Sequence, residues 1–164
     1  MVIQYAPAQT VYSTTGMDSW AKSTTGLVGY ASDVIDNTTN LFCDAHVSGR
    51  FRQGGSGGSG LYQIWAGSLL NDTSYPLNFS GAQGSVTIAT LGQRNAALRC
   101  IASVSVDTSS SQYIDIAPTS LAYWFGGIMP RKWFLWFLNL ADTLNATSGT
   151  GGQCWYTGIS YDIQ

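Results

Sequence analysis

The sequence of 164 residues contains no glutamate: its nine acidic residues are all aspartate, and only seven lysines and arginines accompany them. Glu, Lys, Arg and Gln fill most exposed positions of ordinary helices, so a chain with few of them has poor helix propensity. Thr, Val, Tyr and Trp, which suit a pleated surface, are abundant instead. The composition therefore predicts an all-β protein.

Charge and long apolar runs are also scarce. A net charge of −2 with scattered cations provides no basic stripe for phosphate binding, so no nucleic-acid partner is expected. No run reaches the roughly 18 apolar residues that a membrane helix needs, and the most apolar one, Trp133–Leu138, has the length of a buried strand. The N-terminus lacks the basic and apolar regions of a secretion signal. We therefore expect no membrane partner and a chain that stays in the cytoplasm where it is made.

The sequence has three cysteines and one histidine. Cys43, Cys100 and Cys154 are widely spaced within alternating apolar patterns, which favours buried thiols over a disulfide framework or a metal site. His46 alone cannot complete a zinc site, so no metal or cofactor is expected. It shares a strand face with Asp44 and Ser48, but no Gly-x-Ser-x-Gly elbow is present. The chain is therefore predicted not to be an enzyme.

Residues 40–52 give the clearest strand pattern. Ala45, Val47 and Phe51, with Leu41 and Cys43 before them, alternate with Asp44, His46, Ser48, Arg50 and Arg52, as in a half-buried strand. A Gly/Ser-rich loop at 54–60 follows, and an apolar strand resumes at 61–70, so the two strands are expected to form a hairpin. A synthetic linker between two strands would have the same composition as this loop.

Further strands are expected at 27–30, 85–91, 97–106, 113–116, 133–140 and 154–163, with turn signals between them. In the strand at 97–106, Leu98, Cys100, Ala102, Val104 and Val106 are predicted to share one face. Seven or eight strands in a chain of this length favour a two-sheet antiparallel sandwich, most simply a jelly roll. We assign residues 27–164 to this single domain and residues 1–26 to an N-terminal arm or edge segment.

The order of four motifs resembles a class of tailed-bacteriophage virion proteins. These motifs are Ile35–Val47, the strand at Tyr62–Leu69, Tyr75-Pro76 in a loop, and Ile128-Met-Pro-Arg-Lys-Trp-Phe-Leu-Trp-Phe-Leu-Asn139. In that class a Leu-Pro-Pro-Arg-Trp-like turn opens a strand that ends in Asn. The chain departs from the pattern after Asn139, where Leu140-Ala141 replaces Thr-Gly, and in its Gly-rich loop.

The resemblance implies a jelly-roll capsid decoration, or cement, protein or a head-fibre component. Such a protein would bind the major capsid protein on the outside of the virion as a homotrimer, after assembly in the host cytoplasm. The sequence is compatible with this role, because interfaces are rich in aromatic residues and poor in Lys and Glu.

The N-terminal segment is the candidate capsid contact. Val2, Ile3, Tyr5, Val11 and Tyr12 are apolar residues without an evident strand partner, and an extended arm could add a strand to a neighbouring subunit. A first strand packed on its own domain is an equally good interpretation of the same residues.

The alternative function is a tail, receptor-binding or carbohydrate-binding β-sandwich domain. Lectin-like sandwiches stack sugars on exposed aromatic rings beside Asn and Asp side chains. Candidates for such a platform are Trp20, Tyr30, Tyr75, Trp124 and Trp155.

Overall fold

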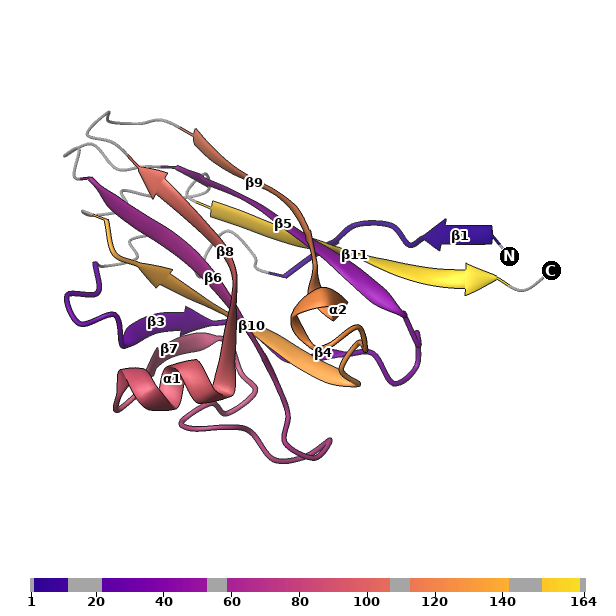
Figure 1. The fold of residues 1–164 in the computed structure, drawn as a ribbon, viewed down its shortest axis with the longest axis horizontal. Coiled ribbons are helices and arrows are strands. Elements are labelled where there is room, and N and C mark those ends of the chain that lie inside the picture. Colours follow the sequence, from indigo (N-terminus) through magenta and orange to yellow (C-terminus); the bar gives the residue numbers. More distant parts are fainter. Residues whose placement is uncertain (1, 12–21, 53–58, 107–112, 142–151, 163–164) are drawn as a thin grey trace.

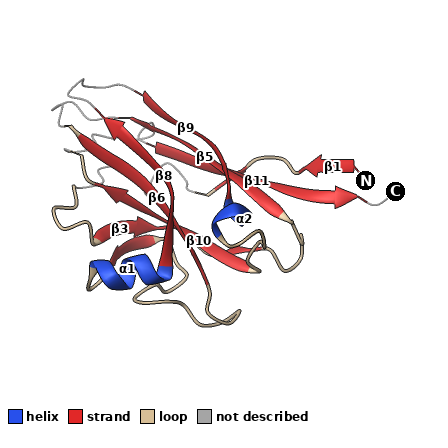
Figure 2. Ribbon diagram, in the orientation of Figure 1, coloured by secondary structure: helices blue, strands red, loops and turns tan. Residues whose placement is uncertain are grey.

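The computed structural model describes residues 2–11, 22–52, 59–106, 113–141 and 152–162. In these residues the chain is mostly β, and its strands form two antiparallel sheets arranged as a sandwich (Figures 1 and 2). The predicted all-β, two-sheet architecture is therefore confirmed. The jelly-roll connectivity remains a prediction.

The first sheet, sheet A, contains five strands in the order β1-β11-β5-β9, with β2 also paired to β11. The long strand β11 is therefore central, with β5 on one side and the two short N-terminal strands on the other. Its strands are β1 (Val2–Tyr5), β2 (Gln9–Thr10), β5 (Asp44–Arg52), β9 (Tyr113–Ser120) and β11 (Gly152–Asp162).

The second sheet, sheet B, contains six strands in the order β7-β3-β10-β6-β8, with β4 also paired to β10. Its strands are β3 (Val28–Ala31), β4 (Ile35–Asp36), β6 (Gly60–Ser68), β7 (Gly84–Thr87), β8 (Leu98–Val106) and β10 (Lys132–Asn139). Two short helices, α1 (Leu91–Ala97) and α2 (Leu121–Trp124), precede β8 and follow β9.

Strand β10 is buried on both of its faces. Every residue from position 133 to 139 is at most 1% exposed. The side chains that join the core between the sheets are Trp133, Leu135 and Phe137, and those that join a second core on the far side of sheet B are Phe134, Trp136 and Leu138. The apolar run therefore forms the buried strand that its length predicted.

The second core exists because chain segments cover the outer face of sheet B. Phe79, in the long β6–β7 connection, packs on Phe134 with ring centroids 4.4 Å apart. Helix α1 is held by Arg94, whose guanidinium lies 4.3 Å from the centroid of the Trp65 ring and donates to the Gly26 carbonyl at 2.8 Å. Sheet B thus has both faces covered (Figure 1).

Two local expectations are wrong. Strands β5 and β6 do not form a hairpin: β5 belongs to sheet A and β6 to sheet B, so the chain crosses between sheets there. Leu41 does not join the buried stripe of β5, because it precedes the strand with φ at +52° and is 72% exposed. The Gly/Ser-rich residues 53–58 of the β5–β6 connection lie outside the described residues.

The predicted single apolar face of β8 is also wrong. The β6–β8 pairing shifts register between Ile64 and Trp65, and a bulge of this kind turns the following side chains to the opposite face. Cys100 therefore packs in the second core, on the far side of sheet B, which we call the outer core. Ile101, expected on the polar face, is instead buried between the sheets.

Close packing around β10 predicts that substitution of two glycines in adjacent strands changes the stability of the protein by different amounts. A Cβ at Gly29 in β3 would collide with the Phe137 carbonyl and the Trp136 indole, and backbone cannot move aside cheaply. A Cβ at Gly84 in β7 would meet no atom within 4 Å. We expect Gly29→Ala to destabilise the protein by about 1–3 kcal/mol and Gly84→Ala to be neutral or slightly stabilising. Urea denaturation of both variants measures the difference, and equal midpoints would contradict the described packing.

Candidate interaction surface

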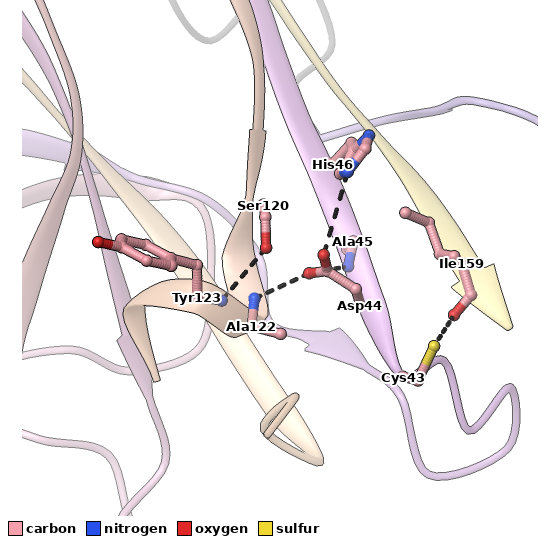
Figure 3. A network of polar contacts seen from close by, with 8 residues as sticks. All are labelled: Cys43, Asp44, Ala45, His46, Ser120, Ala122, Tyr123 and Ile159. Atoms are coloured by element: carbon pink, nitrogen blue, oxygen red, sulfur yellow. Dashed lines mark hydrogen bonds and ion pairs between the residues drawn. The ribbon is translucent and has the colours of Figure 1, made fainter. Parts of the chain in front are cut away.

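Asp44, at the start of β5, is the centre of a polar network (Figure 3). Its Oδ1 accepts hydrogen bonds from the backbone N–H groups of Ala45 at 2.7 Å and Ala122 at 2.8 Å. Its Oδ2 lies 4.0 Å from Nε2 of His46. Ser120 lies opposite His46 in the β5–β9 pairing, and its Oγ accepts from the Tyr123 N–H at 3.2 Å.

This network fixes the first turn of α2. The free N–H groups of a helix start need acceptors, and Asp44 and Ser120 supply them from two different strands. Asp44 Oδ1 and Ser120 Oγ both accept hydrogen bonds from backbone donors, whereas Asp44 Oδ2 is the oxygen that faces His46. Ser48, which shares the polar face of β5 by spacing, is not part of the network, whereas Ser120 was not expected and could be found only from the strand pairing.

The three cysteines are free thiols that are buried or half-buried. Burial raises the pKa of the Cys154 thiol strongly and that of the Cys100 thiol less. Cys43 donates to the Ile159 carbonyl at 3.1 Å. In the described part of the chain, no three His, Cys or Asp side chains gather as metal ligands would.

The N-terminal segment runs along an edge of its own sheet. Strand β1 pairs with the end of β11, and β2 pairs with the middle of β11. Val11 is buried in the core between the sheets, whereas Val2, Ile3 and Tyr5 are exposed. Of the two interpretations of this segment, the structure has the strand packed on its own domain; Tyr12 lies outside the described residues.

Strand β1 and the end of β11 form a two-stranded ribbon, which we define as Val2–Tyr5 with Ser160–Asp162. The last β11 residue paired with β5 is Ile159, and beyond it β11 pairs with β1. Figure 1 shows this ribbon projecting past the other strands of the sandwich.

The ribbon has an apolar outer face and a mixed inner face, on which Val2 lies beside Gln4, Ser160 and Asp162. In β11 the even-numbered residues 154, 156 and 158 are buried toward sheet B, so odd-numbered ones face outward, where Ile159 is itself only 7% exposed. Ile3 lies opposite Tyr161 and Tyr5 opposite Ile159, which places all four side chains on the outer face of sheet A. Ile3, Tyr5 and Tyr161 are each more than half exposed, whereas Gln4 and Asp162 on the inner face hydrogen-bond each other at 3.2 Å.

The outer face of sheet A changes character toward β9. There Arg50 and Asp115 form a two-pronged ion pair at 2.6 and 2.8 Å, and the hydrogen bond from Arg50 lowers the pKa of Asp115. His46, whose ring centroid is 6.4 Å from that of Tyr5, lies between the charged pair and the apolar ribbon. Ile3, Tyr5 and Tyr161 therefore form an exposed apolar group at the ribbon end of this face.

A second exposed apolar group lies around α2. Tyr123 and Ile128 are each about three-quarters exposed, and Tyr123 stands edge-on to Trp124 with centroids 5.4 Å apart. Gly126 and Gly127 follow with positive φ, which turns the chain back toward β10. Both rings of this aromatic pair are exposed at the surface.

The four described candidates for a sugar platform lie on different elements or pack against the cores. Tyr30 packs against the core between the sheets and Tyr75 against the outer core. Trp155 lies on β11 and Trp124 on α2, while Trp20 is outside the described residues. The exposed partner of Trp124 is Tyr123, which local sequence did not single out.

No helix within the described ranges is long and apolar enough to cross a membrane. The sequence matches no protein-family model and no curated protein. What the fold and surface define is a two-sheet β-sandwich protein with one covered sheet and one sheet that carries an exposed apolar ribbon.

The Asp44 network predicts a stability effect at that residue. Asp44→Ala would leave two backbone N–H groups without their acceptor, and we expect a loss of about 1–2 kcal/mol. Asp44→Asn keeps an oxygen in the same place and should retain most of the stability. Thermal unfolding of both variants tests this role, and an unchanged Asp44→Ala protein would contradict it.

Proposed function

We propose that this protein is a non-enzymatic structural component of a bacteriophage particle that binds the outside of the capsid and stabilises it. The observation that carries the proposal is the apolar outer face of the ribbon, where Ile3, Tyr5 and Tyr161 are exposed to water. Apolar side chains gathered on one projecting element mark a surface for a protein partner. The motif order of residues 35–139 supports a phage particle as its setting.

The difference between the two sheets supports a role in binding a partner. Sheet B buries both faces and forms the rigid body, while the outer face of sheet A is left for contact. The proposed partner is the major capsid protein, with the chain attached as a homotrimer. Several weak contacts held together in a trimer raise the effective concentration of each, which resists loss from the shell.

The first test removes the ribbon strand. Deleting residues 2–6 takes away exposed side chains but keeps β2 and buried Val11. We expect a folded protein that no longer co-sediments with shells assembled from the major capsid protein encoded alongside it. Undiminished binding by the folded deletion variant would contradict the proposal.

A point substitution localises the contact to the outer face. Ile3→Lys places a charge on that face, whereas Gln4→Lys places the same charge on the inner face, beside the Asp162 carboxylate. Loss of one well-buried apolar contact costs on the order of 1–2 kcal/mol, so we expect Ile3→Lys to bind shells about tenfold more weakly. Gln4→Lys is the matched control, and equal effects of the two would point away from this surface.

The second candidate function is a tail or receptor-binding domain that recognises carbohydrate. It is favoured by the exposed Tyr123 and Trp124 rings, since aromatic faces stack on sugars. Tyr123→Ala should abolish binding to a glycan array or host cells if this function holds, while shell binding stays intact. The same variant separates the two functions, because the Tyr123 pair and the ribbon lie on different elements.

A further inference from the structure

Among the described residues, no strand pairs with the outer edge of β1, a four-residue edge strand. Edge strands in soluble proteins are usually guarded by charge, proline or a covering segment, because their free N–H and C=O groups can pair with another strand. The opposite edge of sheet A, strand β9, contains Pro118. Strand β1 reads Val-Ile-Gln-Tyr, with neither charge nor proline.

The register fixes which backbone groups of β1 are free. The Ala6 N–H donates to the Gly158 carbonyl at 2.9 Å, and β1 continues the same register, with Gln4 opposite Ser160. In an antiparallel pair, hydrogen-bonded positions alternate, so Val2, Gln4 and Ala6 direct their N–H and C=O groups to β11. Those of Ile3 and Tyr5 therefore point away from the sheet. Pro7, which has no N–H, ends this open stretch.

We propose that β1 pairs with β1 of a second copy of this chain, antiparallel, about a twofold axis that passes beside Gln4. In this register Ile3 of one copy lies opposite Tyr5 of the other. Both residues turn their free N–H and C=O groups toward the partner, so the pair gains four backbone hydrogen bonds. Registers that place Ile3 opposite Ile3, or Tyr5 opposite Tyr5, pair only one of the two positions within β1.

The side chains fit this register on both faces. Within each copy, Tyr5 lies beside Ile159 and Ile3 lies beside Tyr161. The proposed pair would place Tyr5 beside Ile3 of the second copy, so the outer face would carry an unbroken apolar row across all four strands. On the inner face Gln4 meets Gln4 at the axis, where two amides can hydrogen-bond. No like charges face each other across the axis, so a second copy is the occupant that this edge suits.

The pairing uses the edge of the ribbon and leaves its outer face free, so it does not rest on capsid binding. Four residues per copy bury far less than the roughly 800 Å² per partner of a stable interface, and the pair is therefore weak in solution. In a shell that carries trimers, it would join copies that belong to neighbouring trimers. Attachment to the same shell would raise its occupancy.

Cysteine cross-linking of the full-length chain tests the axis. In the proposed pair, Gln4 faces Gln4 of the second copy at a position without hydrogen bonds between the two β1 strands. Opposite Cα atoms at such a position are about 4.5 Å apart, within the range of a disulfide. We expect Gln4→Cys to form a covalent dimer under mild oxidation at least about tenfold faster than the wild-type chain or Val2→Cys, because only residues held in register have a high effective concentration. The wild-type chain controls for the three native cysteines.

A mixing experiment tests the register. Val2 would lie opposite Ala6 of the second copy, also at a non-hydrogen-bonded position. Val2→Cys and Ala6→Cys chains should therefore cross-link when mixed but not when each is oxidised alone. Equal cross-linking of the separate and mixed chains would overturn the register, and a Gln4→Cys rate equal to that of Val2→Cys would overturn the pairing.

A proline substitution links the cross-link to backbone pairing. Ile3→Pro removes the outward N–H that the second copy would use, while the β11 partner uses the N–H groups of Val2 and Gln4. We expect Ile3→Pro to suppress cross-linking through Gln4→Cys without unfolding the domain, as checked by circular dichroism. Persistent cross-linking in this folded double variant would show chance collision and overturn the proposal. Shell binding is measured separately, so failure of either proposal is visible without the other.

Discussion

The fold depends on β10, a strand whose alternate side chains are buried in two different cores. Burying a large apolar side chain stabilises a protein by about 1.5–3 kcal/mol, so its six central residues together contribute on the order of 10 kcal/mol before entropy is counted. Because β10 lies between β6 and the β3 and β4 strands, it fixes the position of every other strand of sheet B. The indole N–H of Trp136, which is fully buried and has no hydrogen-bond partner among the described groups, is the polar cost of this packing.

The two sheets differ in how much of their surface is covered. Sheet B carries α1 and the β6–β7 connection on its outer side, whereas the outer face of sheet A carries His46, the Arg50–Asp115 pair and the ribbon. The inner side of β11 changes along the strand. Its even-numbered residues are buried as far as Gly158, and beyond that point Ser160 and Asp162 take their places. The core between the sheets therefore does not continue into the ribbon.

Local patterns were sufficient for some of these elements and not for others. The alternation of Ala45, Val47 and Phe51 and the unbroken apolar run of β10 predicted their burial correctly, because both depend on side-chain period alone. The crossing of β5 and β6 into different sheets, and the bulge that turns Ile101 inward, depend on pairing between distant segments. No local window contains that information.

The candidate site divides in the same way. The sequence left two interpretations of Val2–Tyr5 open, an extended arm and a strand packed on its own domain, and the pairing with β11 required the complete sheet. Asp44 and His46 were correctly placed on one strand face, yet the role of Asp44 in capping α2 arises from Ala122, 78 residues further along the chain. The surroundings of these residues therefore depend on strand order more than on local motifs.

The central claim is that the outer face of sheet A at the ribbon is the adhesive surface of the molecule. An electron cryo-microscopy map of the particle that contains this chain tests it most directly. The account predicts that Ile3, Tyr5 and Tyr161 are covered by protein in the map, with Tyr123 and Trp124 facing solvent. A map in which the ribbon projects freely into solvent while the α2 end meets the shell would contradict it.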